Sequence, residues 1–266
     1  MVTAAHMLAP AELRAAARSG SFSGLTTGLA PGFVQVNLVI LPARYAGDFI
    51  AFCRANMKAC PVLAIGEAGD PSLPGLGDDI DVRTDCPSYW VHSDGRYAAM
   101  AADIVDVWRD DFVSIGIGCW FSMEDALRRA GVRMRHLELG IQGPLMRTNR
   151  PTEPVGVFGG PLVVSMRPFA REQVETVRAV TARFPSVHGA PIHEGNPKVL
   201  GLSDFDHPDF GEPMKVLPGE VPLYWGCGLT AIAALERARI PLFITHAAGS
   251  MLMTDMRNSE LEETMS

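Results

Sequence analysis

The sequence contains no run of apolar residues that approaches the ~20 needed to cross a bilayer, and no stretch rich in lysine and arginine. The first absence excludes a membrane-spanning helix. The second, together with a net charge of −7, argues against a nucleic-acid partner. Residues 1–20 also lack the charged start and long apolar core of a secretory signal, so we expect a soluble, unprocessed protein.

Cysteine is scarce and widely spaced. The five cysteines are odd in number and include no CxxC pair, which favours reduced thiols and a cytoplasmic protein. The motifs GxxxxGK[ST], GxGxxG and GxSxG are absent. Nucleotide hydrolysis, the usual dinucleotide binding and hydrolase-elbow chemistry therefore have no support.

Apolar and turn-forming residues are plentiful. Hydrophobic residues make up 47% of the 266 residues, which is enough for a sizeable core in one large unit. The 26 glycines and 20 prolines are spread along the chain, as expected for many short elements joined by turns. We expect residues 1–266 to form a single unit. Its subdomain seam is expected near residues 148–156, which are rich in proline and polar residues, and the subdomains are free to interleave along the chain.

Predicted strands and helices alternate along the chain. Period-2 alternation or a short apolar run predicts strands over residues 34–40, 60–66, 112–118, 155–166, 221–225 and 241–246. Helical spacing predicts helices over residues 11–20, 43–57, 98–108, 122–131, 169–184 and 230–239. Such alternation is typical of an α/β fold, in which helices flank the sheets.

Five polar clusters stand where predicted strands end, the usual place for functional residues in α/β proteins. The first contains Arg83, Asp85 and Tyr89. Its arginine could clamp a substrate carboxylate in a bidentate manner, or could instead pair with a neighbouring aspartate in a solvated loop.

The second cluster contains Cys119 and, in the first turn of the next helix, Glu124. A thiol near a helix N-terminus would have a lowered pKa and could act as a nucleophile. The alternatives are that Cys119 is only a small buried apolar residue and that Glu124 only complements the helix dipole.

The third and fourth clusters carry arginine and histidine. Arg147, Asn149 and Arg167 lie among apolar strand residues, where a cation is either part of a structural ion pair or a receptor for a carboxylate. His188 and His193 lie in a loop bounded by glycine and proline. Their spacing does not match an HExxH zinc helix, but an extended loop could aim both imidazoles into one cleft. A structural role for each histidine is the alternative.

The fifth cluster closes the last predicted strand. His246 ends that strand, small residues follow it, and Asp255 lies a short distance beyond. The small residues would let a ligand approach, and the aspartate could orient the imidazole. The plain alternative is a structural histidine bonded to a main-chain carbonyl.

Taken together, several ordered segments of this chain resemble the D-glutamate cyclase family. They are CPVL, DVRTDCPSYWVHSDG, IGCWFSMEDAL, RTN, GVFGGPLVVSMRP, HGAPIHEG, GEVPLYWGCGLT and ITHAAGSMLMTD. The resemblance covers about Leu25 to Asp255, in the compact form of the bacterial members. It implies a single catalytic unit with two α/β subdomains, in which helices flank mixed sheets and the active site lies in the cleft between the subdomains. For the vertebrate mitochondrial members it implies cyclisation of D-glutamate to 5-oxo-D-proline with loss of water.

The resemblance implies a hydro-lyase for a small amino or hydroxy acid that needs neither cofactor nor metal. We expect a base (His246, oriented by Asp255, or His193), an acid (Glu124 or the other histidine) and a carboxylate-binding arginine (Arg83, Arg147 or Arg167). The other candidates are His188 and Cys119 for catalysis, and Asp85, Tyr89 and Asn149 for substrate binding. The alternatives are a hydratase or dehydratase of a hydroxy acid, a metal held by the same histidines and carboxylates, and a non-catalytic protein that binds small carboxylates. A homo-oligomer is a further expectation.

Overall fold

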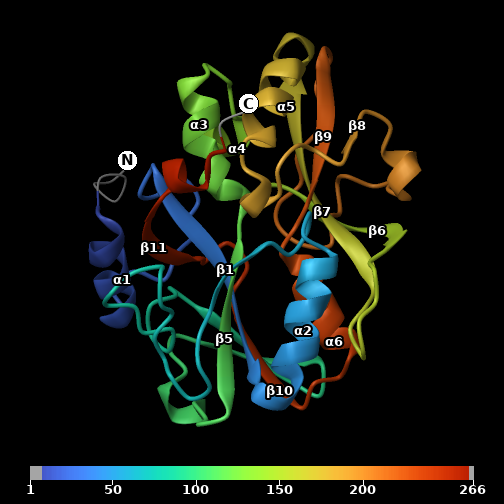
Figure 1. Ribbon diagram of the computed structural model, residues 1–266. Coiled ribbons are helices and arrows are strands. Elements are labelled where there is room, and N and C mark those ends of the chain that lie inside the picture. The colour runs from blue at the N-terminus through green and yellow to red at the C-terminus, as the bar shows by residue number, and fades with distance from the viewer. Residues whose placement is uncertain (1–7, 264–266) are drawn as a thin grey trace.

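The structure, a computed structural model, describes residues 8–263 of the chain. It contains two β-sheets with helices packed against them (Figure 1), which confirms the predicted α/β class. The expectation that a secretory signal is absent concerns residues 1–20, and residues 1–7 of this stretch lie outside the described residues. Among the described helices, none is long and apolar enough to cross a membrane.

The first sheet has seven strands. Six lie in the order β2-β5-β1-β10-β3-β4, and β11 also pairs with β1. These strands are β1 (Phe33–Pro42), β2 (Val62–Ile65), β3 (Tyr89–Ser93), β4 (Arg96–Ala101), β5 (Phe112–Gly118), β10 (Leu242–His246) and β11 (Leu252–Arg257). β1 is buried along nearly its whole length, as its apolar sequence requires at the centre of a sheet.

The second sheet has four strands in the order β6-β7-β9-β8. They are β6 (Leu145–Pro151), β7 (Pro161–Ala170), β8 (His193–Glu194) and β9 (Glu220–Gly226). The chain enters this sheet after β5 and returns to the first sheet between β9 and β10, so the two sheets interleave along the sequence. Residues 148–156 lie in β6 and in the loop that leads to β7, inside the second sheet.

Strand direction differs from the mixed sheets that we expected. β1 and β2 run in the same direction, as a strand-helix-strand unit predicts, but β5 lies between them and is antiparallel to both. In the second sheet, β9 separates β7 and β8 in the same way. Every pairing among the described strands is antiparallel. β3 and β4, like β6 and β7, are consecutive strands, and elsewhere a distant strand inserts between two that run in the same direction.

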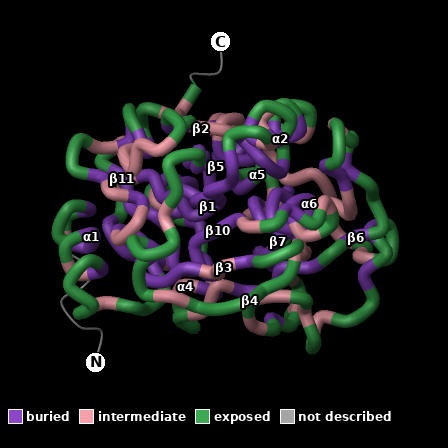
Figure 2. The backbone as a smooth tube through the Cα atoms, turned by 90° about the horizontal axis from the view of Figure 1, so that it is seen from below, coloured by how far each residue is buried: buried purple, intermediate pink, exposed green. Residues whose placement is uncertain are grey.

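Six α-helices of the described residues cover the sheets. They are α1 (Pro10–Arg18), α2 (Ala43–Ala55), α3 (Glu124–Arg129), α4 (Arg135–Leu139), α5 (Val174–Ala182) and α6 (Leu229–Arg237). α2 buries Ala46, Phe49, Phe52 and Cys53, which recur on one helix face. Together with α6, this face forms a core against the first sheet, while α3 and α5 form a second core against strands of the second sheet. Figure 2 shows these buried segments inside an exposed outer layer of loops and helix faces.

The helix predicted over residues 98–108 is wrong. Residues 96–101 form the edge strand β4, which pairs with β3, and residues 105–107 form a single 3-10 turn. Alanine and methionine favour a helix in isolation, but pairing with an adjacent strand overrides so weak a preference. The other predicted helices and strands are present, with ends that shift by several residues.

Candidate active site

A cavity lies between the two sheets. Its wall consists of Asn37, Cys119, Trp120, Phe121, Gln142, Leu145, Ser165, Arg167, His188, Gly226, Cys227, Gly228, Leu229, His246, Ala248 and Met251. The first sheet contributes the end of β10 and the residues after β5, and the second contributes β7 and the residues after β9. The volume is about 30 Å³, room for one or two water molecules, so an amino acid can enter only if parts of the wall move.

Two glycines let the main chain of one half approach the other. A Cβ atom at Gly226 would lie 2.3 Å from the carbonyl oxygen of Lys58, and a Cβ atom at Gly228 would lie 2.5 Å from the side-chain nitrogen of Asn37. No side chain fits at either distance. The turn from β9 into α6 therefore packs directly on β1 and on the loop after α2, and this contact positions Cys227 and Leu229 at the cavity.

Three donors in the cavity wall have no hydrogen-bond partner among the described residues. They are Nε of Arg167, Nε1 of Trp120 and the hydroxyl of Ser165, and all three side chains are buried. The arginine and tryptophan nitrogens can only donate. Each such group left unpaired in a protein interior costs about 1–3 kcal/mol, so an acceptor that enters the cavity would be stabilised by these donors.

Arg167 is the cation of this cavity. It is 2% exposed, its Nη1 donates to the carbonyl of Met166 at 2.8 Å, and among the described residues no carboxylate forms an ion pair with it. Its guanidinium carbon lies 5.1 Å from the centroid of the Trp120 ring. Burial lowers the pKa of Arg167, but a guanidinium remains charged in proteins. A buried cation of this kind fits the role of carboxylate receptor that the sequence left open.

The two cavity histidines hold their protons on opposite ring nitrogens. Nδ1 of His188 lies 3.1 Å from the carbonyl oxygen of Lys58, which can only accept, so the proton is assigned to Nδ1, and the main chain of Gly118 also hydrogen-bonds this ring. Nδ1 of His246 accepts the N–H of Leu38 at 3.2 Å, closer than the Leu38 carbonyl at 3.4 Å, so the proton is on Nε2. Burial lowers the pKa of each imidazole to about 4, and both rings are therefore neutral near pH 7.

Glu124 and His136 form a buried pair next to the cavity. Nε2 of His136 lies 2.9 Å from Oε1 of Glu124, and the His136 ring lies edge-on to Trp120 with the ring centroids 5.3 Å apart. Burial lowers the pKa of His136, and the nearby Arg167 lowers it further. Glu124 is thus close to the candidate site, separated from it by Trp120.

Cys119 lies at the cavity but is not activated. Burial raises its pKa to about 12, and burial raises the pKa of Cys227, which also lines the cavity, to about 11. Main-chain N–H groups of Phe121 and Leu229 oppose these shifts without overcoming them. Both side chains are therefore neutral thiols, in contrast to the lowered pKa that the position of Cys119 before a helix suggested.

Three of the predicted substrate-binding residues have structural partners elsewhere. Arg83 pairs with Asp81 at 2.7 Å, the internal pairing that was left open as an alternative. Asp85 is buried and accepts from Nη2 of Arg18 at 2.7 Å, and the hydroxyl of Tyr89 accepts the N–H of Cys86 at 2.9 Å.

Arg147, His193 and Asp255 also lie apart from the cavity. Arg147 is half-exposed and pairs with Asp209 at 3.1 Å. His193 is on β8 at the edge of the second sheet, where its Nε2 lies 2.8 Å from the carbonyl oxygen of Asn196. Asp255 pairs with Arg14 at 2.8 Å and does not contact His246. Arg147 lies in β6, His193 in β8 and Asp255 in β11, and none of these positions is at the strand ends that reach the cavity.

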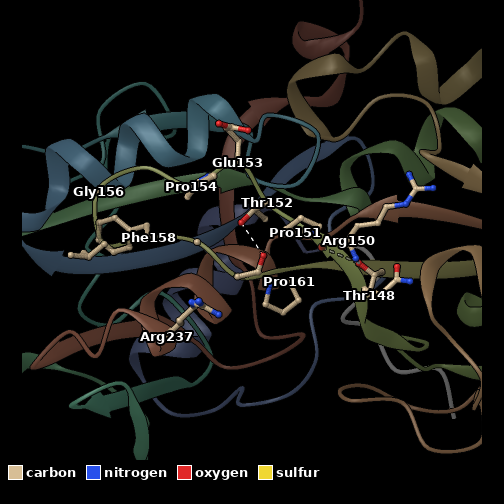
Figure 3. A pocket seen from close by; sticks show the side chains of 14 residues that line it. Thr148, Arg150, Pro151, Thr152, Glu153, Pro154, Gly156, Phe158, Pro161 and Arg237 are labelled. Carbon is tan, nitrogen blue, oxygen red and sulfur yellow. Dashed lines mark hydrogen bonds between the residues drawn. The ribbon is translucent and has the colours of Figure 1, made fainter.

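Asn149 lines a different pocket. Residues 148–161 and Arg237 surround an open groove of about 680 Å³, drawn in Figure 3. Arg150 and Arg237 stand at opposite ends of it, and Thr152 uses its hydroxyl on the carbonyl of Gly160 at 3.0 Å. Although this groove is larger, its polar side chains are exposed or already paired, so we take the smaller cavity as the candidate site.

Sequence reasoning missed several residues of the cavity wall. Trp120 follows Cys119 directly, and its position in that cluster was the available signal. Asn37 is one of two polar residues, with Gln35, in a mostly apolar strand, which was a second signal. His136 lies in a short helix that none of the strand-end clusters includes. Within residues 8–263, no three histidine, cysteine, aspartate or glutamate side chains are grouped as metal ligands would be.

The geometry can be set beside known proteins. The family model described as D-glutamate cyclase matches residues 113–255. The chain belongs to the D-glutamate cyclase family. Proteins with the name "Putative hydro-lyase" from Bordetella petrii, Jannaschia sp. and Burkholderia multivorans are 51%, 50% and 50% identical to it. The alignments cover 93%, 92% and 96% of this chain and 94%, 92% and 98% of the respective relative. The matched region includes every cavity residue from Cys119 to Met251, so family membership and the cavity concern the same part of the molecule.

Proposed function

We propose that this protein is a hydro-lyase that cyclises D-glutamate to 5-oxo-D-proline with loss of water, in the cavity between the two sheets. The observation that carries the proposal is the buried guanidinium of Arg167, which has no carboxylate partner and an unpaired Nε in the described structure, beside the unpaired donors of Trp120 and Ser165. A carboxylate oxygen satisfies all three kinds of donor. Membership of the D-glutamate cyclase family supports the choice of glutamate.

The reaction needs proton transfer at two positions of one molecule. Glutamate enters with an ammonium group and two carboxylates, and the lactam forms when the neutral amine attacks the γ-carboxyl carbon. The nitrogen loses two protons, and the departing oxygen gains two and leaves as water, so no net proton is exchanged with the solvent. An intramolecular attack that closes a five-membered ring mainly requires the bent conformer to be held and the protons to be moved.

The cavity residues suit these steps. Arg167 holds the α-carboxylate, and Nε2 of His188 accepts a proton from the amine. Nε2–H of His246 donates to a γ-carboxyl oxygen, which makes that carbon more electrophilic and stabilises the charge that develops on the oxygen. Binding of an anion beside His188 raises its basicity above that of the empty cavity. Gln142, Ala248 and Met251 lie in loops, and these parts of the wall must move to admit the substrate.

A second candidate is dehydration of a small hydroxy acid. It rests on the hydro-lyase names of the relatives, and it uses the same base and acid to remove water across a carbon–carbon bond. The product would be an unsaturated acid rather than a lactam. We also propose a cytoplasmic location, which the five free cysteines support.

The deciding experiment is product analysis by chiral chromatography and NMR. Purified protein is incubated with D-glutamate, L-glutamate and a set of short 2- and 3-hydroxy acids, and the reverse reaction is run from 5-oxo-D-proline. We expect 5-oxo-D-proline from D-glutamate only. An unsaturated acid as the sole product would replace the first candidate by the second. Binding of these acids without any turnover would mean a carboxylate-binding protein, and the proposal would then be rejected.

A further inference from the structure

Asn37 brings an amide of fixed orientation to the cavity wall. It lies in β1, is 6% exposed and lines the cavity. Its Nδ2 donates to the carbonyl of Ile117 at 3.3 Å and to the carbonyl of Gly118 at 3.0 Å. Because carbonyl oxygens only accept, these two bonds assign the nitrogen of the amide and therefore its oxygen. That oxygen, Oδ1, accepts no hydrogen bond from the described residues.

The turn from β9 into α6 holds this amide in place. A Cβ atom at Gly228 would lie 2.5 Å from Nδ2 of Asn37 and 2.9 Å from Oδ1, so the glycine packs directly against the amide. Rotation of the amide would break both bonds to the carbonyls of β5. Polar atoms inside proteins nearly always have a partner, so an oxygen held in this way favours a ligand that donates to it.

Two single residues connect Asn37 to the cavity histidines. The carbonyl of Gly118 accepts from Asn37, and the main chain of Gly118 also hydrogen-bonds the ring of His188. Leu38, the next residue of β1, donates its N–H to Nδ1 of His246 at 3.2 Å. The amide therefore lies close to both groups to which the proposed reaction assigns proton transfer.

An ammonium group needs acceptors, and the cavity wall offers few. Its arginine and tryptophan can only donate, and its thiols are weak acceptors. The side-chain oxygens of the wall belong to Asn37, Gln142 and Ser165. No side-chain hydrogen bond fixes the Gln142 amide among the described residues, and the Ser165 hydroxyl has no partner and can turn. Of these three, Asn37 is the side chain whose partners determine which atom accepts.

We propose that Oδ1 of Asn37 binds the α-ammonium group of an amino-acid substrate and holds it beside His188. The inference rests on the proposed function, in which Arg167 holds the α-carboxylate. The ammonium group donates one N–H to Oδ1 in a charge-assisted hydrogen bond. After the base has taken a proton, the neutral amine still donates an N–H to Oδ1, so the nitrogen stays in place for the attack. The site thereby selects amino acids over the same acids without an amine.

Two ligands that cannot form a lactam test this assignment. D-norvaline has the five carbons, the amine and the α-carboxylate of D-glutamate but no γ-carboxyl group, and pentanoate lacks the amine as well. The affinity of the unaltered protein for each is measured by calorimetric titration at pH 7. We expect D-norvaline to bind about 10-fold or more tightly than pentanoate.

Asn37→Leu keeps the shape of the side chain and removes its oxygen. We expect the affinity for D-norvaline to fall by about 10-fold or more and that for pentanoate to stay within about 3-fold. Asn37→Asp keeps an oxygen at this position and retains the preference for the amine. Gln35→Met is the matched control: Gln35 also lies in β1 and donates Nε2 to two carbonyls, those of Thr26 and Leu29, but does not line the cavity. Both affinities stay unchanged in this control.

A second measurement does not depend on the folding of Asn37→Leu. The Nδ2 signals of Asn37 in ¹H–¹⁵N spectra of the unaltered protein, assigned by their loss in Asn37→Asp, should shift with D-norvaline and not with pentanoate. Equal loss of both affinities in Asn37→Leu, an unchanged preference, or signals that do not respond to D-norvaline overturns this inference alone. If neither ligand binds the unaltered protein, Arg167 is not a carboxylate receptor, and the proposed function falls together with the inference.

Discussion

The guanidinium of Arg167 lies against the face of the Trp120 ring, 5.1 Å from its centroid, and neither the Nε of one nor the Nε1 of the other has a partner in the described structure. Both side chains line the cavity, and Nη1 of the arginine donates to the carbonyl of Met166 while its Nε has no partner. A charged group is stable in such a place only when something compensates for its lost hydration. A bound carboxylate supplies that compensation, which links the stability of the cation to occupancy of the site.

Replacement of Arg167 by methionine removes the charge and keeps most of the volume. We expect the affinity for 5-oxo-D-proline and D-glutamate to fall by about 100-fold or more, because a charge-assisted hydrogen bond to the carboxylate is lost. The thermal midpoint without ligand stays the same or rises, since an unpaired buried charge is gone. Calorimetric titration and a thermal-shift assay measure the two quantities.

Arg83→Met is the matched control for this variant. Arg83 pairs with Asp81 on the surface, so its removal leaves carboxylate affinity unchanged. Equal loss of affinity in the two variants would show that Arg167 is not the receptor.

The opposite tautomers of His188 and His246 predict different responses to glutamine. The glutamine amide can donate from the place of an imidazole Nε2 but cannot accept and carry a proton as a base. We expect His188→Gln to lower kcat by at least about 100-fold, and His246→Gln, which still offers an N–H, to lower it by about 10-fold. Affinity for 5-oxo-D-proline changes little in either variant.

The tautomers themselves are observable without turnover. In two-bond ¹H–¹⁵N correlation spectra of the unaltered protein at pH 7, His188 should carry its proton on Nδ1 and His246 on Nε2. The two variants assign the signals, because each removes one of them. The same tautomer on both rings, or a charged ring, would contradict the assignment of base and donor.

Cys119 is expected to be dispensable for the chemistry. A thiol with a pKa raised to about 12 is almost entirely protonated near neutral pH, and the proposed reaction needs no thiolate. Cys119→Ala should retain kcat within about 3-fold, the scale of a small packing change. Intact-protein mass spectrometry during turnover should show no adduct. A covalent adduct, or a loss of activity like that of His188→Gln, would restore Cys119 as a nucleophile.

His92 gives a prediction about stability and pH. Its ring stacks on Phe243 with centroids 4.2 Å apart, both ring nitrogens lack partners in the described structure, and burial lowers its pKa to about 4. The unfolded chain binds a proton at the ordinary histidine pKa near 6.5, so the free energy of unfolding decreases as pH falls from about 6.5 to about 4. His92→Phe keeps the stacked ring and removes the titrating group.

We expect His92→Phe to raise the free energy of unfolding by about 1 kcal/mol at pH 7, because unpaired buried polar atoms are removed. It should also reduce the loss of stability between pH 6.5 and pH 4, measured by urea titration at several pH values. His207→Ala serves as the control, since Asp204 raises the pKa of this exposed histidine and its removal does not flatten the slope. A slope unchanged by His92→Phe would mean that His92 is not neutral in the fold.

The sequence predicted the parts of the fold that depend on local pattern. Alternation identified β1 and β5, and apolar spacing identified α2 and α6. It failed at residues 96–101, whose alanines and methionine favour a helix, because the neighbouring β3 strand decides the conformation there. Antiparallel insertion of β5 between β1 and β2 was equally beyond local pattern, since it depends on pairing between distant segments.

The same distinction holds for the candidate site. Cys119 and His246 were found because they stand at strand ends, Arg167 because it lies among apolar strand residues, and His188 because it lies in a loop bounded by glycine and proline. His193 stands only five residues from His188, yet β8 carries it to the edge of the second sheet. Sequence distance indicates which residues can be neighbours, but the direction of the chain after each strand determines which of them face one cavity.

The close approach of Gly226 and Gly228 to the opposite half of the molecule limits how this family can change its substrate. At these positions even a methyl group would force the two sheets apart, because main-chain atoms of Lys58 and the amide of Asn37 already occupy the space. Positions 226 and 228 of the cavity wall therefore tolerate only glycine. New substrate specificities are expected to come from changes at the loop residues Gln142, Ala248 and Met251. A library restricted to these three positions should yield altered acid selectivity with little loss of folded protein, whereas substitutions at the two glycines should yield almost none.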